Sequence, residues 1–289
     1  MSMDQLSTII LAASLIIIML GMGLSLTLAD FKRVLLYPRA IFIGLFNQLI
    51  LLPIIGFGIA TVFNLPPEIA VGIMILAACP GGPTSNLISH LAKADLALSV
   101  TLTALSSLIT IITIPFLVTF ALTHFMQQGQ LIQLNIPATI LQIFVIVVVP
   151  VVIGMFIRHY SPGFAMRMGK PVRIASGVVL MLIIVGLVLK EKDNFASYFK
   201  QAGLATFLLN ALTMCIGFYS ARLLKIGKAQ ATAISIESGI QNGTLAISIA
   251  VVLLNNSAFA IAPAVYSLLM FFTGGLVIYL GNKFASKTD

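Results

Sequence analysis

The sequence predicts an all-α polytopic membrane protein with nine transmembrane helices, and three observations lead to this fold class. Of 289 residues, 60% are hydrophobic and only 8% are charged, whereas soluble domains are about 45–50% apolar and about 25% charged. The apolar residues form continuous runs of roughly 20, the length that crosses about 30 Å of hydrocarbon. These runs do not show the residue-by-residue alternation of a membrane β-barrel.

The nine predicted spans cover most of the chain, and each is bounded by short polar segments. They are residues 6–28, 40–63, 67–92, 95–123, 131–157, 173–189, 201–224, 228–254 and 258–281. The chain does not open with the basic segment of a secretory signal, so we expect the first run to be a retained helix.

The basic residues predict the orientation. If the N-terminus lies outside, thirteen of the sixteen Lys and Arg residues fall in inner loops, and only Lys190, Lys192 and Lys200 fall in outer loops. Cytoplasmic loops carry such an excess of Lys and Arg. We therefore expect a multi-pass protein of the cell (inner) membrane, with its N-terminus outside and its C-terminus cytoplasmic.

The excess of positive charge does not indicate a nucleic-acid partner. The net charge of +8 comes from sixteen basic and eight acidic residues, and nucleic-acid binding requires clustered basic residues on a water-exposed scaffold. Cys79 and Cys215 both lie inside apolar runs, so a disulfide framework is not expected. The expected surroundings are a lipid bilayer, and no metal centre other than for Na⁺ is expected.

Two predicted spans are interrupted near their middles. Span 67–92 contains Cys-Pro-Gly-Gly-Pro-Thr-Ser-Asn at 79–86, and span 228–254 contains Glu-Ser-Gly-Ile-Gln-Asn-Gly-Thr at 237–244. Proline removes a backbone donor and glycine has low helix propensity. Unpaired backbone in lipid costs several kcal/mol per group, so such breaks persist only inside protein or beside a water-filled cavity.

The order of intact and broken helices repeats along the chain. Spans 40–63, 67–92 and 95–123 correspond to 201–224, 228–254 and 258–281, and the two sets enter the membrane from opposite sides. This pattern predicts inverted repeats with two crossing discontinuous helices, as in secondary transporters. Span 6–28 pairs with 173–189, and 131–157 has no counterpart.

Glu237 is the one acidic residue that lies well inside a predicted span. An intramembrane carboxylate is costly and generally marks a path for an ion or a proton. Broken helices also expose free N–H groups at one end and free carbonyls at the other, which attract an anion and a cation respectively. The alternative is a protonated Glu237 that forms a hydrogen bond between helices.

Neutral oxygens are expected near this carboxylate. Ser99 and Thr103 are four residues apart and share one helix face, while Ser85 and Asn86 follow the first break. Together with Glu237 they form an oxygen set that suits a hard monovalent cation such as Na⁺. Serine and threonine also join membrane helices without any ligand. Mid-span amides extend the polar set: Gln48, Asn210, Gln241 and Asn242.

The motifs themselves resemble the bile acid:sodium symporter family. The resemblance is carried by Cys-Pro-Gly-Gly-Pro-Thr-Ser-Asn-Leu-Ile-Ser (79–89), Ala-Leu-Ser-Val-Thr-Leu-Thr (97–103) and Ile-Glu-Ser-Gly-Ile-Gln-Asn (236–242). Residues 21–26 and 47–53 extend it over nearly the whole chain. Bacterial relatives usually have an extra N-terminal span, and the chain resembles a bacterial-type homologue that lacks this helix.

The resemblance implies a single transporter unit over 1–289 with two domains. A core domain would comprise about 40–123 and 201–284, and a panel domain about 6–28 and 131–189. The implied first sodium site contains Ser85, Asn86, Ser99, Thr103 and Glu237. The implied second site contains Gln48, Glu237, Gln241 and the backbone carbonyls of Ser238 and Ile240. The expected substrate residues are Thr84, Asn242 and Asn210.

Two departures from the family pattern leave the substrate open. Pro83-Thr84 stands where relatives often have Thr-Ala, and residues 267–272 are almost wholly apolar where some relatives have His and Asn. We therefore expect a sodium-coupled symporter of an organic anion, which is either bile-acid-like or a smaller carboxylate such as pantoate or a keto acid. Transport would proceed by alternating access with two Na⁺ ions.

Other functions fit the sequence less well. A proton-coupled carrier or a cation/proton antiporter would use Glu237 as its titrating group, but a proton needs no cage of oxygens. An intramembrane enzyme would need a paired acid, a Ser/His or Cys/His arrangement, or a metal site, so we expect no enzymatic activity. A channel or purely structural subunit is the remaining alternative.

Overall fold

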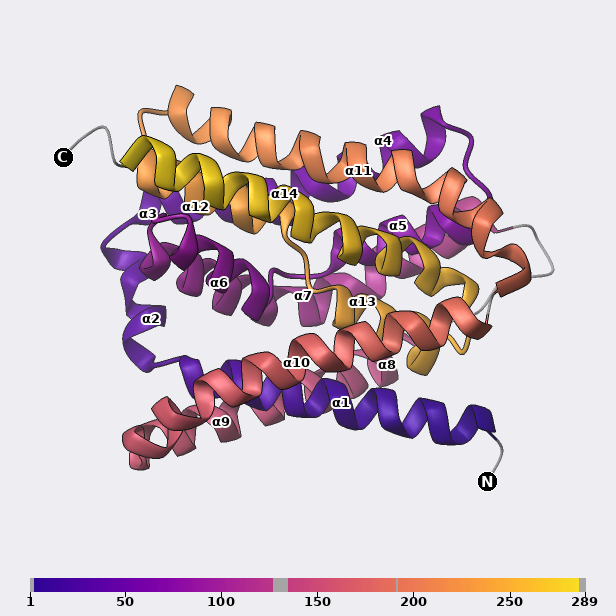
Figure 1. Cartoon of the computed structure of the whole chain (residues 1–289), viewed down its shortest axis with the longest axis horizontal. Coiled ribbons are helices and arrows are strands. Elements are labelled where there is room, and N and C mark those ends of the chain that lie inside the picture. The colour runs from indigo at the N-terminus through magenta and orange to yellow at the C-terminus, as the bar shows by residue number, and fades with distance from the viewer. Residues whose placement is uncertain (1–2, 127–134, 191, 286–289) are drawn as a thin grey trace.

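The computed structural model describes residues 3–126, 135–190 and 192–285, which fold almost entirely into helices (Figure 1). The α-helices are α1 (Met3–Ser25), α2 (Leu28–Lys32), α3 (Pro38–Phe46), α4 (Leu52–Val62), α5 (Pro67–Ala78), α6 (Pro83–Leu91), α7 (Leu96–Phe125), α8 (Ile136–Ile143), α9 (Val149–Tyr160), α10 (Pro162–Lys190), α11 (Lys192–Leu223), α12 (Lys228–Gly239), α13 (Gly243–Ser248) and α14 (Ile261–Ala285). Shorter turns are the 3₁₀ turns η1 (Arg33–Leu35) and η5 (Ala258–Ala260) and the π-helical turns η2 (Asn47–Leu51), η3 (Phe144–Val148) and η4 (Ile249–Leu253).

Several helical stretches match the predicted spans. In the part of the chain that the structure describes, five are long and apolar enough to cross a membrane, or six if α1 and the bent segment after it count as one. The five are Pro38–Val62, Leu96–Phe125, Ile136–Tyr160, Phe199–Leu223 and Ala258–Lys283. The all-α membrane class is thus confirmed for the described residues, whereas the nine-span count stays a prediction. Residues 131–134 of one predicted span lie outside the described residues.

The first span is bent where a straight helix over 6–28 was expected. Segments Leu11–Ser25 and Leu28–Leu35 meet at 72°. The Asp30 carboxylate accepts hydrogen bonds from the Thr27 backbone N–H (2.7 Å) and hydroxyl (2.8 Å), and pairs with Arg33. Thr101 of α7 donates to the Asp30 carbonyl at 2.9 Å. This capping arrangement begins a new helix and anchors α2 against α7.

Helix α10 begins at Pro162, well before the predicted start of the span at residue 173. Likewise, α11 begins at Lys192 rather than at 201. Hydropathy predicts only the apolar part of a helix, whereas hydrogen bonding continues into polar sequence such as that around Arg167. Proline fits the first position of a helix because its missing N–H would have no intrahelical partner there.

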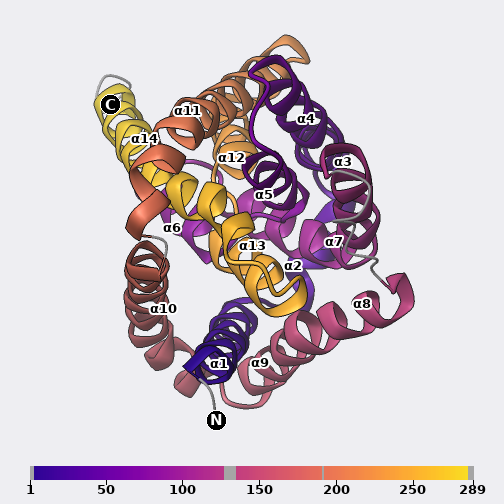
Figure 2. The same cartoon turned by 90° about the vertical axis from the view of Figure 1, so that its right-hand side faces the viewer.

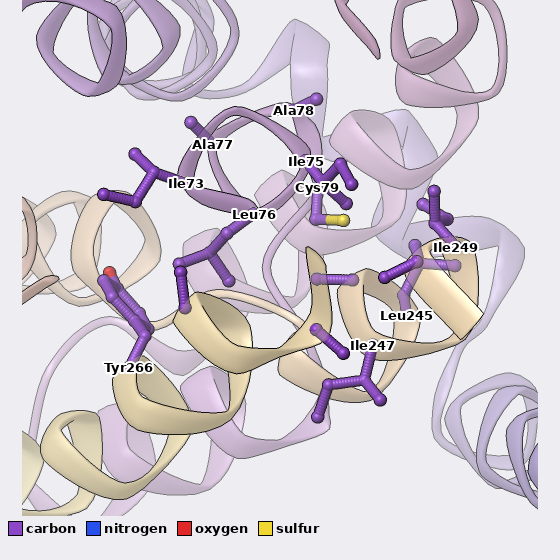
Figure 3. Close-up of a cluster of buried hydrophobic side chains, with 14 of the residues drawn as sticks. Ile73, Ile75, Leu76, Ala77, Ala78, Cys79, Leu245, Ile247, Ile249 and Tyr266 are labelled. Atoms are coloured by element: carbon purple, nitrogen blue, oxygen red, sulfur yellow. The ribbon is translucent and has the colours of Figure 1, made fainter. Parts of the chain in front are cut away.

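The broken helices form the centre of the molecule. Every residue of α5 from Ile69 to Ala78 is buried, as is every residue from 233 to 250 across α12, α13 and the start of η4. Figure 3 shows side chains of α5 and α13, with Tyr266 of α14, packed into one cluster. The expectation that interrupted backbone requires protein surroundings is therefore met.

The other helices surround this centre on two sides. Helix α1 packs against α9 and α10, while α11 packs against α12 and α14. Figure 2 shows α1, α8, α9 and α10 along one side of the molecule and α3, α4, α11 and α12 on the other. The predicted division into a panel domain and a core domain is compatible with this arrangement of helices, but it stays a prediction.

Candidate functional site

The first break is made by proline and glycine backbone. Helix α5 ends at Ala78, Cys79 is extended, and α6 begins at Pro83 after Gly82. No side chain caps the N-terminus of α6, because Gly82 holds the capping position. The first N–H groups of a helix have no intrahelical partner, so this nine-residue helix directs partial positive charge into the break.

The second break is made differently, with a polar side chain at its far end. Helix α12 ends at Gly239, Ile240 is extended, and α13 begins at Gly243. The Asn242 side chain accepts a hydrogen bond from the Leu245 N–H at 3.0 Å. This is a regular N-cap, which satisfies one of the free donors of α13.

The two breaks lie against each other. Gly81 and Gln241 form an isolated antiparallel bridge, and the Asn242 N–H donates to the Pro80 carbonyl at 2.9 Å. In Figure 1 the linker between α5 and α6 passes the linker between α12 and α13 in the middle of the molecule. The predicted crossing of two discontinuous helices is therefore present.

Glu237 is completely buried beside this crossing. Its two carboxylate oxygens accept hydrogen bonds from Ser99 (2.6 Å) and Thr103 (2.8 Å) of α7. These two hydroxyls also lie 2.9 and 3.3 Å from the Asn86 side-chain oxygen, and Ser85 lies 3.5 Å from Thr103. All five residues of the predicted first sodium site thus converge around one carboxylate.

Gly81 allows this convergence. A Cβ atom at position 81 would meet the Glu237 Oε2 atom and would lie 3.3 Å from the Ser85 hydroxyl. The first break therefore approaches the carboxylate so closely that a side chain cannot be placed between them. Glycine is needed here for close approach, and the sequence signal for it was the double glycine of the break.

The predicted second site is also assembled around Gln241. Its amide nitrogen donates to the carbonyls of Ser238 (2.9 Å) and Glu237 (3.1 Å), and the Gln48 amide lies 3.4 Å from its oxygen. The Gln48 Oε1 atom is buried without a hydrogen-bond partner. A buried oxygen without a partner costs free energy, which a bound cation would recover.

Gln48 lies in the π-helical turn η2, which the sequence reading did not predict. Such turns occur often at functional sites because they widen the helix and redirect side chains. Pro53, which lacks a backbone donor, follows the turn closely and is the one signal in the sequence for this irregularity.

A cavity adjoins the crossing on the side of α6. A pocket of about 110 Å³ is lined by Thr84, Asn242 and residues of α1, α10 and α14. A neighbouring pocket of about 370 Å³ shares Ile18, Pro83 and Leu87 with it, and is lined further by Asn86 and His90. The structure thus places the predicted substrate residues Thr84 and Asn242 at one pocket, next to the proposed ion sites.

Asn210 lies elsewhere, within the packed helices behind the second break. It is fully buried, and its amide nitrogen donates to the Gly239 carbonyl at 2.6 Å. Tyr266 of α14, which the sequence reading did not select for this site, donates to the same carbonyl at 2.6 Å. Contacts this remote in sequence leave no local signal. The expectation that Asn210 binds substrate stays a prediction.

Taken together, a multi-pass membrane fold with two interrupted helices crossing at a buried carboxylate defines the class of secondary transporters. Comparison with known proteins then gives the family. Residues 12–198 match the model of the sodium bile acid symporter family, and the chain belongs to this family. Its members are transporters and not enzymes.

Curated relatives align along most of the chain. A probable sodium/metabolite cotransporter of Arabidopsis thaliana chloroplasts, BASS1, is 31% identical over 94% of this chain and 67% of its own length. The uncharacterized sodium-dependent transporter YocS of Bacillus subtilis is 30% identical over 94% and 82%. The human ileal sodium/bile acid cotransporter is 27% identical over 84% and 69%.

Proposed function

We propose that this protein is a sodium-coupled symporter of an organic anion that works by alternating access. The observation that carries the proposal is the buried Glu237 carboxylate at the crossing. Among the residues that the structure describes, its oxygens accept hydrogen bonds from hydroxyl groups and form no salt bridge with a basic side chain. A buried charge requires a partner of opposite charge. A sodium ion supplies it, and the names of the relatives point to the same ion.

The first ion is held by Glu237 with the oxygens of Ser85, Asn86, Ser99 and Thr103. On binding, the hydroxyls of Ser99 and Thr103 turn their lone pairs toward the ion and cease to donate to the carboxylate. One carboxylate with neutral oxygens suits a hard monovalent cation. A proton would need only the carboxylate, so the oxygen shell favours sodium over the proton-coupled alternative.

The second ion is held by Gln48, Gln241 and Glu237, with the carbonyls of Ser238 and Ile240. The unpaired Oε1 atom of Gln48 supports this assignment. In this structure the Gln241 amide nitrogen donates to the Ser238 carbonyl. On binding, the sodium ion takes the place of this amide nitrogen at the carbonyl. Because the Glu237 carboxylate belongs to both sites, each ion lowers the cost of burying it and the two ions bind cooperatively.

The substrate carboxylate binds in the pocket at Thr84 and Asn242, where the uncapped N-terminus of α6 attracts an anion. The rest of the lining is largely apolar and includes Ile18, Leu180 and Met270. The substrate is therefore an organic anion with an apolar body, either bile-acid-like or a smaller carboxylate such as pantoate or a keto acid.

Alternating access follows from movement of a panel domain, about 6–28 and 131–189, against a core domain, about 40–123 and 201–284. The pockets lie at this boundary, between α1 and α10 on one side and α6 on the other. With two sodium ions per monoanion, one positive charge enters per cycle. The membrane potential then contributes about 2.3 kcal/mol per 100 mV. The protein lies in the inner membrane with a cytoplasmic C-terminus.

Proteoliposomes test the coupling directly. A set of small carboxylates and bile acids is first screened for thermal stabilisation of the purified protein with and without Na⁺. Uptake of the best ligand is then measured under an inward Na⁺ gradient and an equal K⁺ gradient. We expect uptake only with Na⁺, accelerated by an inside-negative potential. Equal uptake with K⁺ excludes sodium coupling, and uptake driven by a pH gradient without Na⁺ supports the proton-coupled alternative.

A further inference from the structure

Gly239 is the last helical residue before the second break. It ends α12 and lies between Ser238 and Ile240, whose carbonyls are the proposed ligands of the second ion. A Cβ atom at this position would meet the Met214 side chain of α11, so the packing of α11 on α12 requires glycine. Glycine restricts the backbone less than other residues. The peptide after Gly239 is held at its N–H end by the hydrogen bond from Ile240 to the Ile236 carbonyl at 2.7 Å, and its carbonyl end needs contacts from elsewhere.

Two buried side chains hold the carbonyl end of this peptide. The Tyr266 hydroxyl donates to the Gly239 carbonyl at 2.6 Å, and the Asn210 amide donates to the same oxygen at 2.6 Å. Asn210 also lies 3.4 Å from the Tyr266 hydroxyl. Both residues are fully buried, and Figure 3 shows the Tyr266 ring extending from α14 beside Leu76.

We propose that Tyr266 and Asn210 are positioning residues for the second sodium site. A carbonyl oxygen has two lone pairs, and these two donors occupy both on Gly239. The Gly239 carbonyl is thereby withdrawn from the ion, and the peptide that joins Gly239 to Ile240 is held in one orientation. The neighbouring carbonyls of Ser238 and Ile240 are then preorganised for sodium. This inference rests on the sodium-coupled function proposed above.

The same helix connects this contact with the substrate pocket. Ser267, next to Tyr266, packs against Gly243 at the start of α13, where a Cβ atom would meet its hydroxyl. One turn further along α14, Met270 and Phe271 line the 110 Å³ pocket. Tyr266 itself does not line that pocket. Loss of the Tyr266 hydroxyl should therefore weaken sodium binding directly. It should change the substrate KM mainly as a consequence of weaker sodium binding.

The test is Tyr266→Phe, which removes only the hydroxyl, together with Asn210→Ala and the double variant. The sodium concentration for half-maximal uptake is measured, as are the Hill coefficient for sodium and the substrate KM at saturating sodium. A neutral hydrogen bond contributes about 0.5–1.5 kcal/mol, so each single variant should raise the half-saturating sodium concentration roughly 3- to 10-fold. The double variant should raise it further and reduce the Hill coefficient toward one.

Tyr279→Phe is the matched control, because Tyr279 lies on the same helix and is 59% exposed. It should leave the sodium dependence unchanged. Melting temperatures without sodium separate positioning from general stability. If the variants melt earlier but keep the parental sodium midpoint, the residues only stabilise the fold and the inference is overturned. If the parent itself shows no sodium dependence, the proposed function fails, and this inference fails with it.

Discussion

The two breaks meet at one point but are built by opposite means. The first consists of Pro80, Gly81 and Gly82, and its second half-helix begins without a side-chain cap. The second contains Gln241 and Asn242, whose side chains bind neighbouring backbone groups. The start of α6 therefore has no side-chain cap, although its Ser85 N–H donates to the Gly82 carbonyl at 3.0 Å, whereas the second break satisfies a donor of α13 with the Asn242 side chain and concentrates oxygens. This difference supports the proposed binding of the anion at α6 and of the cations at the end of α12.

The Glu237 carboxylate connects the helices that flank the two breaks. Glu237 belongs to α12, but the hydroxyls that hold it come from α7, and Asn86 and Ser85 beside it come from α6. In the proposed function, sodium binding would draw these elements together, and the anion would bind in the pocket at Thr84 and Asn242. The contrast between the two breaks supports the proposal that one crossing serves both ions and substrate, and substitutions at Glu237, at Gly81 and Gly82, and at Asn242 test it.

Glu237→Gln should have the largest effect on sodium binding, because it removes the negative charge that both proposed sodium sites share. Removing one partner of a buried charge pair costs about 3–5 kcal/mol, so sodium affinity should fall about 100-fold or more. Sodium-stimulated uptake and sodium-dependent thermal stabilisation are measured together. Glu68→Gln, at the start of α5, is the control and should retain both. Normal sodium-stimulated uptake by Glu237→Gln would remove the carboxylate from the mechanism.

Gly81→Ala and Gly82→Ala sharpen the comparison within the first break. A Cβ atom at position 81 would meet the Glu237 carboxylate, whereas one at position 82 would lie 3.5 Å from Asn242 in ordinary contact. Overpacking costs about 1–3 kcal/mol, so Gly81→Ala should weaken sodium-dependent stabilisation roughly 5- to 100-fold in sodium concentration. Gly82→Ala should leave that stabilisation within about twofold of the parent. Equal effects of both variants would mean that the close approach does not matter for the ion.

Asn242→Ala should have the smallest effect and tests the second break. Loss of an N-cap costs about 1 kcal/mol, or roughly 2–4 °C in melting temperature for a chain of this size. Asn135 caps α8 in the same manner, with the Ala138 N–H at 3.1 Å, and is exposed. Asn135→Ala should cost similar stability, but only Asn242→Ala should raise the substrate KM. An unchanged KM in Asn242→Ala would exclude the residue from the substrate site.

The breaks and the carboxylate were predictable from the sequence because each carries its own local signal. Proline and glycine in the middle of an apolar run indicate interrupted helix, and Glu237 is conspicuous because it is the one acidic residue well inside a predicted span. Ser99 and Thr103 follow from helix periodicity. Their convergence with Ser85 and Asn86 came from the family resemblance, and the hydrogen bonds around Glu237 now give it a geometric basis.

The remaining features depend on contacts between residues far apart in the chain. The bend after Ser25 is held by Thr101, about seventy residues away, whose hydroxyl binds the Asp30 carbonyl. The contact of Tyr266 with Gly239 joins two helices across 27 positions. The π-helical turn η2 at Gln48 packs against α7, α11 and α12, which are distant in sequence. Hydropathy and local propensity report none of these contacts, because each is a property of the packed molecule.

The bond between Asn242 and Pro80 limits how this transporter can open and close. Any relative sliding of the two linkers would break that bond and the adjoining Gly81–Gln241 pairing between buried residues, and buried backbone groups without a partner are costly. We therefore expect the two linkers to stay joined throughout the transport cycle, so that the proposed substrate and sodium sites move as one rigid unit. If transport proceeds by alternating access as proposed, we expect the surrounding helices to make the movement that exposes the sites first to one compartment and then to the other.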